Sequence, residues 1–418
     1  MRQQEKAFLA ALRLPKQRRV DVDESLDELS RLAESAGAQV VGRLTQERKA
    51  PSASLYFGKG KVEEIKTLSR REHADLMISD DALSPIQERN LGGSLGLRVI
   101  DRTALILDIF AQRARTMEGK LQVELAQLSY MLPRLVGQWK HLERLGGGIG
   151  TRGPGETQIE SDRRMIRHRI RKITEELKRV RVHRRLLRDR RKASGVPVVA
   201  LVGYTNAGKT TLLNRLTGAS AIAADQLFVT LDPTARLVSS SPHTSFVLTD
   251  TVGFIRKLPH QLVAAFKATL EELAEADVLL HVVDASHPAL DDQVAAVEQL
   301  LGELELTERP TIVVLNKADR LDAADASLAG LLERFRGVAV SALTGEGIGL
   351  LLARVDEALR PGVERATLRI PYGDGPAVAL CYARGRVLGR SDEADGIRLE
   401  VELPRRLLAP LAVYRDTA

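Results

Sequence analysis

The feature that most constrains this sequence is a glycine-rich loop between a predicted buried strand and a predicted helix. Residues 203–211 read Gly-Tyr-Thr-Asn-Ala-Gly-Lys-Thr-Thr, which satisfies the pattern G-x-x-x-x-G-K-[ST], and the apolar run 196–202 precedes them. Backbone N–H groups of such a loop wrap phosphates at the positive end of the helix. The predicted phosphate-binding residues are Gly203, Tyr204, Thr205, Asn206, Ala207, Gly208, Lys209, Thr210 and Thr211.

Short apolar runs rich in Val, Leu and Ile recur around this loop. They cover residues 196–202, 246–249, 278–283, 311–315 and 338–340. Because they do not alternate with polar residues, they are typical of parallel strands that are buried on both faces. We therefore predict an α/β fold with a mostly parallel sheet over residues 196–362.

The identity of the nucleotide base is predicted from the segment that follows the fourth of these strands, Asn316, Lys317, Ala318 and Asp319. A carboxylate at Asp319 can accept hydrogen bonds from the N1–H and N2–H₂ groups of guanine, and adenine offers neither of these donors. Asn316 is expected to orient the site, and the Lys317 stem to lie along the base. The backbone of Ser341, Ala342 and Leu343 is expected to meet the guanine O6. The expected ligand is therefore GTP or GDP.

Two further segments are expected to hold Mg²⁺ and the γ-phosphate. Asp250 ends a strand and can hold the metal through water, while Gly253 N–H can bond the γ-phosphate. The metal residues are then Thr210, Asp250 and, in the first switch loop, Thr230, with Thr234 as the fallback. Asp284 also ends a strand, and we interpret it as structural. The two segments comprise Phe228, Val229, Thr230, Leu231 and Asp232, and then Asp250, Thr251, Val252 and Gly253.

The expected catalytic residues are Lys209, Thr230 and Gly253. Phe254 stands where Ras-type proteins place a glutamine that orients the attacking water. Because an apolar ring cannot position water by hydrogen bonding, we expect slow GTP hydrolysis that a partner stimulates.

Four domains are predicted from the way apolar runs and helical periodicity change along the 418-residue chain. Residues 1–100 mix short strands with helices, as in a small α/β domain. Residues 101–195 carry two helical stripes, at Leu121 to Leu135 and Ile166 to Val180, which predict an antiparallel hairpin around a glycine-rich loop. Residues 196–362 form the nucleotide domain. Residues 363–418 predict a strand-rich domain, with strands at 377–381 and 396–403.

The second helix of this hairpin is strongly basic. Half of the positions from Arg163 to Lys192 are Lys or Arg, and the formal net charge of the chain is +7. Like charges one turn apart repel, so a sustained excess of one sign favours a polyanionic partner. The candidate RNA-binding residues are Arg152, Arg163, Arg164, Arg181, Arg184 and Arg185.

The sequence also bears on the cellular compartment in which the protein is expected. No apolar run approaches the roughly 18 residues that span a bilayer, and no secretory signal is recognisable at the N-terminus. Cys381 is the single cysteine, which fits a reducing compartment. The expected location is the cytoplasm.

The chain resembles the HflX family of GTPases over nearly its whole length. The most specific segment is residues 146–164, Gly-Gly-Gly-Ile-Gly-Thr-Arg-Gly-Pro-Gly-Glu-Thr-Gln-Ile-Glu-Ser-Asp-Arg-Arg, which is similar to the family signature ahead of the GTPase domain. The resemblance implies a cytoplasmic monomer that binds the large ribosomal subunit and its RNA. It also implies Mg²⁺-dependent GTP hydrolysis coupled to splitting or rescue of stalled ribosomes.

Two alternatives stay open at this point. Some family members are reported to hydrolyse ATP and to act as RNA helicases, so one alternative is an ATP-dependent RNA remodeller that uses the N-terminal domain. The other is an RNA-binding protein in which the nucleotide only fixes the conformation.

Overall fold

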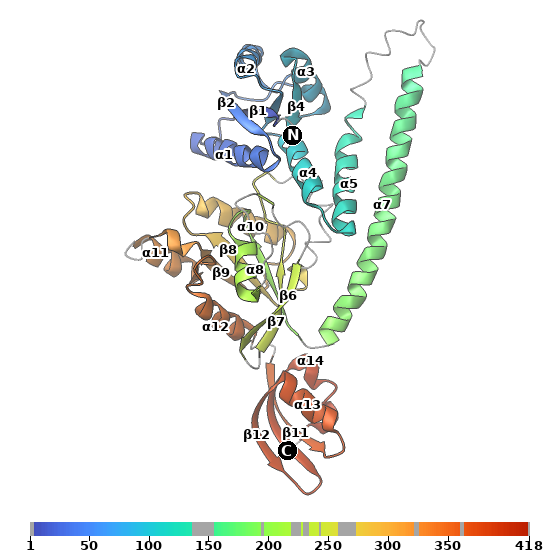
Figure 1. Ribbon diagram of the computed structural model, residues 1–418, viewed down its shortest axis with the longest axis vertical. Helices are drawn as coiled ribbons and strands as arrows, with labels where there is room; N and C mark the ends of the chain where they lie inside the picture. The colour runs from blue at the N-terminus through green and yellow to red at the C-terminus, as the bar shows by residue number, and fades with distance from the viewer. Residues whose placement is uncertain are drawn as a thin grey trace. The chain divides into compact units, whose positions relative to one another are not determined.

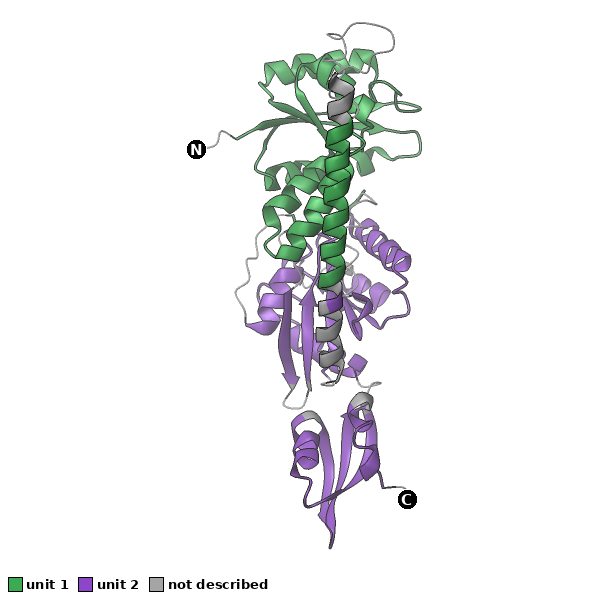
Figure 2. Cartoon of the chain, turned by 90° about the vertical axis from the view of Figure 1, so that its right-hand side faces the viewer, with its two compact units in different colours: residues 1–180, 224–232, 255–267 green, residues 181–223, 233–254, 268–418 purple. Residues whose placement is uncertain are grey.

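The computed structural model describes residues 4–135, 154–193, 196–218, 227–228, 234–241, 244–257, 273–321, 326–359 and 363–416. The chain divides into two compact units (Figure 2). The first comprises residues 1–180 with the segments 224–232 and 255–267, and the second comprises the remaining residues. The predicted α/β class is confirmed, because both units contain parallel sheets. The boundaries of the four predicted domains stay a prediction.

The sheet of the first unit has four parallel strands in the order β2-β1-β3-β4. These are β1 (Lys6–Arg13), β2 (Gln39–Glu47), β3 (Leu76–Ser79) and β4 (Arg98–Asp101). The helices α1 (Arg19–Ser35), α2 (Lys59–Arg71), α3 (Pro85–Leu95) and α4 (Arg102–Arg113) connect and cover them. The strand order reverses between β1 and β3, so this sheet has a topological switch point at its carboxyl edge.

The helical hairpin has the predicted apolar seam. Helix α5 (Met117–Met131) packs Leu121 against Ile173 and Leu177 of α7 (Pro154–Ala193). An ion pair between Arg169 and Glu124, 2.6 Å long, lies beside this seam. Helix α7 begins at Pro154, earlier than the predicted loop implies. Proline is favoured in the first turn of a helix because its missing N–H has no partner to lose there.

The sheet of the second unit has six strands in the order β10-β9-β8-β5-β7-β6. The five predicted strands are β5 (Val198–Gly203), β7 (Thr244–Asp250), β8 (Val278–Asp284), β9 (Thr311–Asn316) and β10 (Val338–Ala339). An antiparallel edge strand, β6 (Thr234–Ser241), was not predicted, because among its described side chains, Thr234 to Ser240, Val238 is the only buried one. Helices α8 (Lys209–Thr217), α10 (Leu290–Glu303), α11 (Ala326–Phe335) and α12 (Ile348–Leu359) accompany this sheet (Figure 1).

The C-terminal part is a three-stranded antiparallel sheet, β11-β13-β12, as the predicted strand-rich character requires. Its elements are β11 (Val363–Pro371), α13 (Gly375–Arg384), β12 (Arg386–Asp392), β13 (Gly396–Pro404) and α14 (Arg405–Leu408). The strand predicted at 377–381 is wrong, since these residues lie in α13. Asp374 caps that helix by accepting a hydrogen bond from Ala377 N–H, and a proline lies in its first turn. These signals favour a helix. No described helix is long and apolar enough to cross a membrane.

Candidate nucleotide site

The glycine-rich loop leaves β5 and enters α8, as the motif predicts. Two of its glycines are required by their surroundings. Gly208 has φ +94°, and a Cβ there would lie 2.2 Å from Asn316 Nδ2. A Cβ on Gly203, whose φ is +148°, would lie 2.2 Å from the Val282 carbonyl oxygen. Only glycine therefore lets this loop pack against β8 and the start of the Asn316 segment.

Lys209 lies inside the loop, with an exposed fraction of 6%. Its Nζ donates hydrogen bonds to the carbonyl oxygens of Gly203 at 3.0 Å and Tyr204 at 2.7 Å. Burial lowers the pKa of Lys209 to about 8, and the nearby charge of Asp250 opposes this shift. Buried His281 on β8 has its pKa lowered to about 4 by burial and by Lys209. His281 is thus neutral at pH 7, and Lys209 is the cation of this loop.

Two predicted metal residues meet at the end of β7. The Thr210 hydroxyl donates a hydrogen bond to Asp250 Oδ2 at 2.9 Å, and Asp250 is fully buried. A hydroxyl and a carboxylate at this spacing suit Mg²⁺, which keeps several waters and substrate oxygens as ligands. No cluster of three His, Cys, Asp or Glu residues that could hold a metal occurs in the described parts of the chain. The donor set therefore fits Mg²⁺ shared with a nucleotide rather than a metal in an all-protein cage.

Asn316 connects the glycine-rich loop, which is expected to bind the phosphates, with the segment 341–343, which is expected to meet the base. Its Nδ2 donates to the Ala207 carbonyl oxygen at 2.8 Å, and its Oδ1 accepts from Ala342 N–H at 3.0 Å. One buried amide therefore fixes the glycine-rich loop and the Ser-Ala-Leu segment in a single arrangement. Arg215 of α8 supports the same segment by donating to the Ala342 carbonyl oxygen at 3.1 Å.

Lys317 and Asp319 follow Asn316 in the order that the prediction requires. Lys317 has φ +63°, and its Nζ lies 2.7 Å from Asp284 Oδ2. Asp284 also accepts hydrogen bonds from the backbone and hydroxyl of Ser286. Hydrogen bonds from Lys317 and Ser286 outweigh burial and lower the pKa of Asp284. Asp284 thus orients Lys317, while Thr210 pairs with Asp250. Ala318 and Asp319 belong to a short 3₁₀ turn, and Asp319 is exposed.

Gly253 and Phe254 lie directly against the glycine-rich loop. The Phe254 carbonyl oxygen accepts from Thr205 N–H at 2.7 Å, and Phe254 N–H donates to the Gly203 carbonyl oxygen at 3.1 Å. A Cβ on Gly253 would lie 2.9 Å from Thr205 Cα and 3.0 Å from Lys209 Nζ. The predicted γ-phosphate donors, Lys209 and Gly253, are therefore neighbours in the fold.

Of the remaining predicted residues, some lie in the described part of the chain and others lie outside it. Phe228 is described and buried, and Thr251 and Val252 are buried between Asp250 and Gly253. Ser341 and Ala342 are buried and Leu343 is exposed. Thr234, the fallback metal residue, pairs with Asp250 in the β6–β7 ladder. Val229, Thr230, Leu231, Asp232 and Arg152 lie outside the described residues.

The candidate RNA-binding arginines lie on helix α7, apart from Arg152. Arg163 is half-buried and Arg164 is exposed. Arg181, Arg184 and Arg185 belong to the same helix, and their side chains lie outside the described part of the structure.

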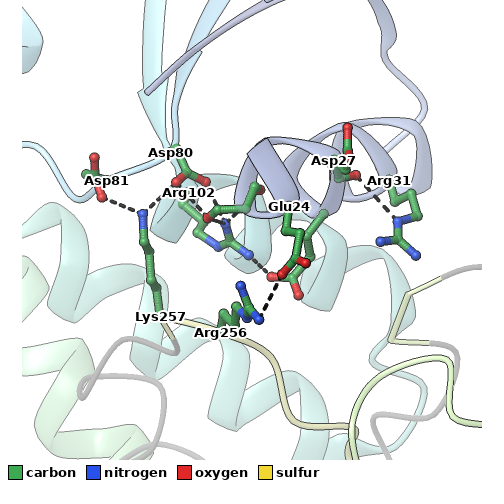
Figure 3. Close-up of polar contacts among 10 residues, drawn as sticks. Glu24, Asp27, Arg31, Asp80, Asp81, Arg102, Arg256 and Lys257 are labelled. Carbon is green, nitrogen blue, oxygen red and sulfur yellow. Dashed lines mark hydrogen bonds and ion pairs between the residues drawn. The ribbon is translucent and has the colours of Figure 1, made fainter. Parts of the chain in front are cut away.

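Sequence reasoning missed two cations just past Phe254. Arg256 pairs with Glu24, and Lys257 pairs with Asp80 and Asp81 (Figure 3). No spacing rule signals these contacts, because Lys257 lies 177 residues from Asp80 and 176 residues from Asp81 along the chain. Adjacency to the Gly253 segment is the only hint that the sequence offers.

Four family models match the chain. They are the GTP-binding GTPase N-terminal model over residues 23–111, the GTP-binding GTPase Middle Region over 113–191, the 50S ribosome-binding GTPase over 198–317 and the HflX C-terminal domain over 331–410.

Curated relatives match over most of their length. The GTPase HflX of Caldanaerobacter subterraneus is 49% identical over 91% of this chain and 88% of its own. The GTPase HflX of Escherichia coli is 48% identical over 91% of this chain and 90% of its own. A GTP-binding protein from Sulfolobus solfataricus, solved in complex with GDP, aligns with a TM-score of 0.45 and 26% identity over 85% of this chain and 98% of its own. From the identity to the two curated relatives and its extent along both chains, this chain belongs to the HflX family of GTPases.

Proposed function

We propose that this protein binds GTP with Mg²⁺ at the site described above and couples its hydrolysis to an action on the large ribosomal subunit, namely splitting or rescue of stalled ribosomes. The observation that carries the nucleotide assignment is the bridge made by Asn316. It ties the phosphate loop at Ala207 to the base-side segment at Ala342. A loop and an Asn-Lys-x-Asp segment joined in this way form one binding site.

The proposed roles within the site are those that the sequence predicts, and the geometry of the described residues supports them. Lys209 and Gly253 N–H bind the γ-phosphate, Thr210 and Asp250 hold the metal, and Asp319 reads the guanine. Thr230 of the first switch loop completes the metal shell and acts with Lys209 and Gly253 in catalysis. Mg²⁺ supplies charge neutralisation between the β- and γ-phosphates when it is bound. Lys209 starts in contact with two carbonyl oxygens, so phosphate oxygens replace carbonyl oxygens as its acceptors.

Slow intrinsic turnover is part of the proposal. The Phe254 side chain is 4% exposed, and its backbone is bonded to the loop at Gly203 and Thr205. A buried apolar ring at this position provides no hydrogen bond to orient an attacking water. A partner that supplies or reorders a polar group at the site is therefore expected to stimulate hydrolysis.

The partner surface is proposed on helix α7. Its exposed basic side chains include Arg164, Arg167, Arg171, Lys172 and Arg179. Such a row suits recognition of RNA phosphates and shape. The matching family model is described as a 50S ribosome-binding GTPase, which agrees with a ribosomal partner. The protein is proposed to act as a monomer in the cytoplasm.

The alternative of an ATP-dependent remodeller is not favoured by the first unit. Ligands of open parallel sheets bind at the carboxyl edge beside the topological switch point. In this sheet the edge carries Asp80 and Asp81, directly after β3, and Asp101, at the end of β4. These carboxylates pair with Arg102, Arg134 and Lys257 of the same chain, so a triphosphate would have to displace them from their cations, and this edge is a poor nucleotide site.

Steady-state GTP hydrolysis tests the proposal. Wild-type protein is assayed alone and with purified large ribosomal subunits, with Lys209→Ala as the blank. Strong stimulation by the subunits supports the proposal. Confirmed binding of the subunits without any stimulation would contradict the coupling while leaving GTP binding in place.

A further inference from the structure

One buried hydroxyl of the glycine-rich loop has no hydrogen-bond partner among the residues that the structure describes. It is the Thr205 hydroxyl, and the residue as a whole is 6% exposed. Buried polar groups of folded proteins nearly always have a partner, because the loss of water contacts is otherwise uncompensated. An exception within a candidate binding site indicates that a ligand supplies the missing partner.

The backbone of Thr205 is already engaged. The pattern G-x-x-x-x-G-K-[ST] leaves this position open to any residue, since such a loop binds phosphates through backbone N–H groups. Thr205 N–H, however, donates to the Phe254 carbonyl oxygen at 2.7 Å. The hydroxyl is therefore the group that Thr205 can offer to a ligand.

Thr205 lies on the side of the loop where the γ-phosphate is proposed to bind. A Cβ on Gly253 would lie 2.8 Å from Thr205 Cγ2 and 3.0 Å from Lys209 Nζ. The two side chains thus border the same point beside Gly253. Because Lys209 and Gly253 N–H are the proposed donors to the γ-phosphate, a phosphate group that binds both of them lies beside Thr205 as well.

Two other threonines at the site have protein partners. The Thr210 hydroxyl donates to Asp250 Oδ2 at 2.9 Å. The Thr251 hydroxyl donates to the Leu201 carbonyl oxygen at 2.6 Å. The fold therefore occupies these two hydroxyls, and within the described part of the chain it leaves the Thr205 hydroxyl available.

We propose that the Thr205 hydroxyl binds the γ-phosphate of GTP directly, by donating a hydrogen bond to one of its oxygens. This inference rests on the proposed GTP site and adds to it a side chain that distinguishes GTP from GDP, which has no γ-phosphate. A hydrogen bond to a charged oxygen in a buried site is stronger than one between neutral groups. Thr205 therefore favours the triphosphate over the diphosphate.

The test compares the affinities of nucleotide-free protein for GDP and for GMPPNP, a non-hydrolysable GTP analogue that keeps the γ-phosphate oxygens. Thr205→Val removes the hydroxyl and keeps the branched shape of the side chain. It is expected to lower the affinity for GMPPNP about tenfold, because a hydrogen bond to a charged group is lost, and to leave the affinity for GDP unchanged. Thr205→Ser keeps the hydroxyl and should keep the wild-type ratio of the two affinities.

Thermal unfolding of the nucleotide-free protein separates a ligand contact from a structural role. Because the hydroxyl has no partner in the described structure, its replacement by a methyl group should leave the unfolding midpoint unchanged or raise it. A hydroxyl with a structural role would make Thr205→Val less stable than the wild type.

The matched control is Ser69→Ala on α2. Ser69 is 0% exposed, and its hydroxyl also has no partner among the described residues. Because Ser69 belongs to no predicted nucleotide segment, its replacement should leave the ratio of GMPPNP affinity to GDP affinity unchanged.

Several outcomes would overturn the inference alone. They are an unchanged GMPPNP affinity in Thr205→Val, an equal loss of affinity for GDP, and a lowered unfolding midpoint. Slower GTP hydrolysis with an unchanged GMPPNP affinity would also overturn it, because the hydroxyl would then act on the attacking water. Wild-type protein that binds no guanine nucleotide would overturn the proposed function and this inference together.

Discussion

The carboxyl edges of the four-stranded parallel sheet and of the mostly parallel six-stranded sheet carry opposite charges. At the end of β5, a glycine-rich loop presents backbone N–H groups and Lys209. At the ends of β3 and β4, the chain presents Asp80 and Asp101 instead. Both edges have the topology at which open α/β sheets bind ligands. The comparison teaches that topology supplies the place and that residue chemistry chooses the ligand, an anion at one edge and cationic side chains of the same chain at the other.

The largest effect is expected when the acidic edge of the first unit's sheet loses Arg102, which pairs with its carboxylates. Arg102→Met leaves Asp80 and Glu28 buried without their shared partner, so the free energy of unfolding should fall by about 3–5 kcal/mol. Arg98→Met is the matched control, because the Arg98–Glu5 pair is more than half exposed on both sides, at 58% and 53%. It should cost no more than about 1 kcal/mol. Urea denaturation measures both, and equal losses would show that burial of the cluster has no special weight.

The phosphate edge is expected to respond in the opposite direction. Lys209 has a pKa of about 8 in the fold, below its ordinary value of 10.5. Below pH 8 the lysine is charged in both states, and the folded state carries the full cost of burying that charge. As pH rises from 8 to 10.5 the folded state loses its proton first, so that cost fades.

Lys209→Met should therefore stabilise the nucleotide-free protein at pH 7, by up to about 3 kcal/mol, while abolishing GTP binding. The gain should shrink above pH 8. Thermal unfolding of both proteins across this pH range measures it. A variant that is less stable than wild type at pH 7 would contradict a net cost of burying the charged lysine.

A change at the base side sharpens the contrast between ligand classes. Asp319→Asn replaces an acceptor that guanine N1–H and N2–H₂ require, and the cost should be roughly 1–3 kcal/mol in the preference for GTP over ATP. Competition titrations with both nucleotides report this preference. Retention of the full GTP preference would place the guanine contact on another residue.

The smallest effect is expected on the surface of α7. Replacing exposed Arg164, Arg167 and Arg171 by Gln should weaken RNA binding and reduce the salt slope by roughly one unit or less per lost phosphate contact. A matched triple change at Arg365, Arg369 and Arg390 removes the same charge from the C-terminal sheet. Those arginines already pair with Glu400, with Glu393 and Asp395, and with Asp392. Equal losses of RNA affinity in the two variants would remove α7 as the specific surface.

Sequence patterns predicted what depends on local chemistry. Val278–Val283 and Thr311–Leu315 are strands because continuous apolar runs must be buried on both faces. The glycine-rich loop lies between β5 and α8 because its glycines allow conformations that other residues avoid. The seam of Leu121 against Ile173 and Leu177 follows from helical periodicity.

Long-range contacts were beyond these patterns. The bridge made by Asn316 and the pairing of Lys257 with Asp80 join residues 109 and 177 positions apart. The apolar run Ala377–Cys381 satisfied a strand pattern, yet the Asp374 cap placed it in α13. The roles assigned to the site residues, Thr230 among them, stay predictions.

The most direct test of the opposite-edge account is the stoichiometry of nucleotide binding. Equilibrium dialysis with radiolabelled GTP and ATP is carried out on wild-type protein and on Lys209→Ala. We predict one guanine nucleotide per chain in the wild type, no competing ATP site, and loss of all nucleotide binding in Lys209→Ala. ATP binding that survives Lys209→Ala would place a second nucleotide site outside the glycine-rich loop and would contradict the account.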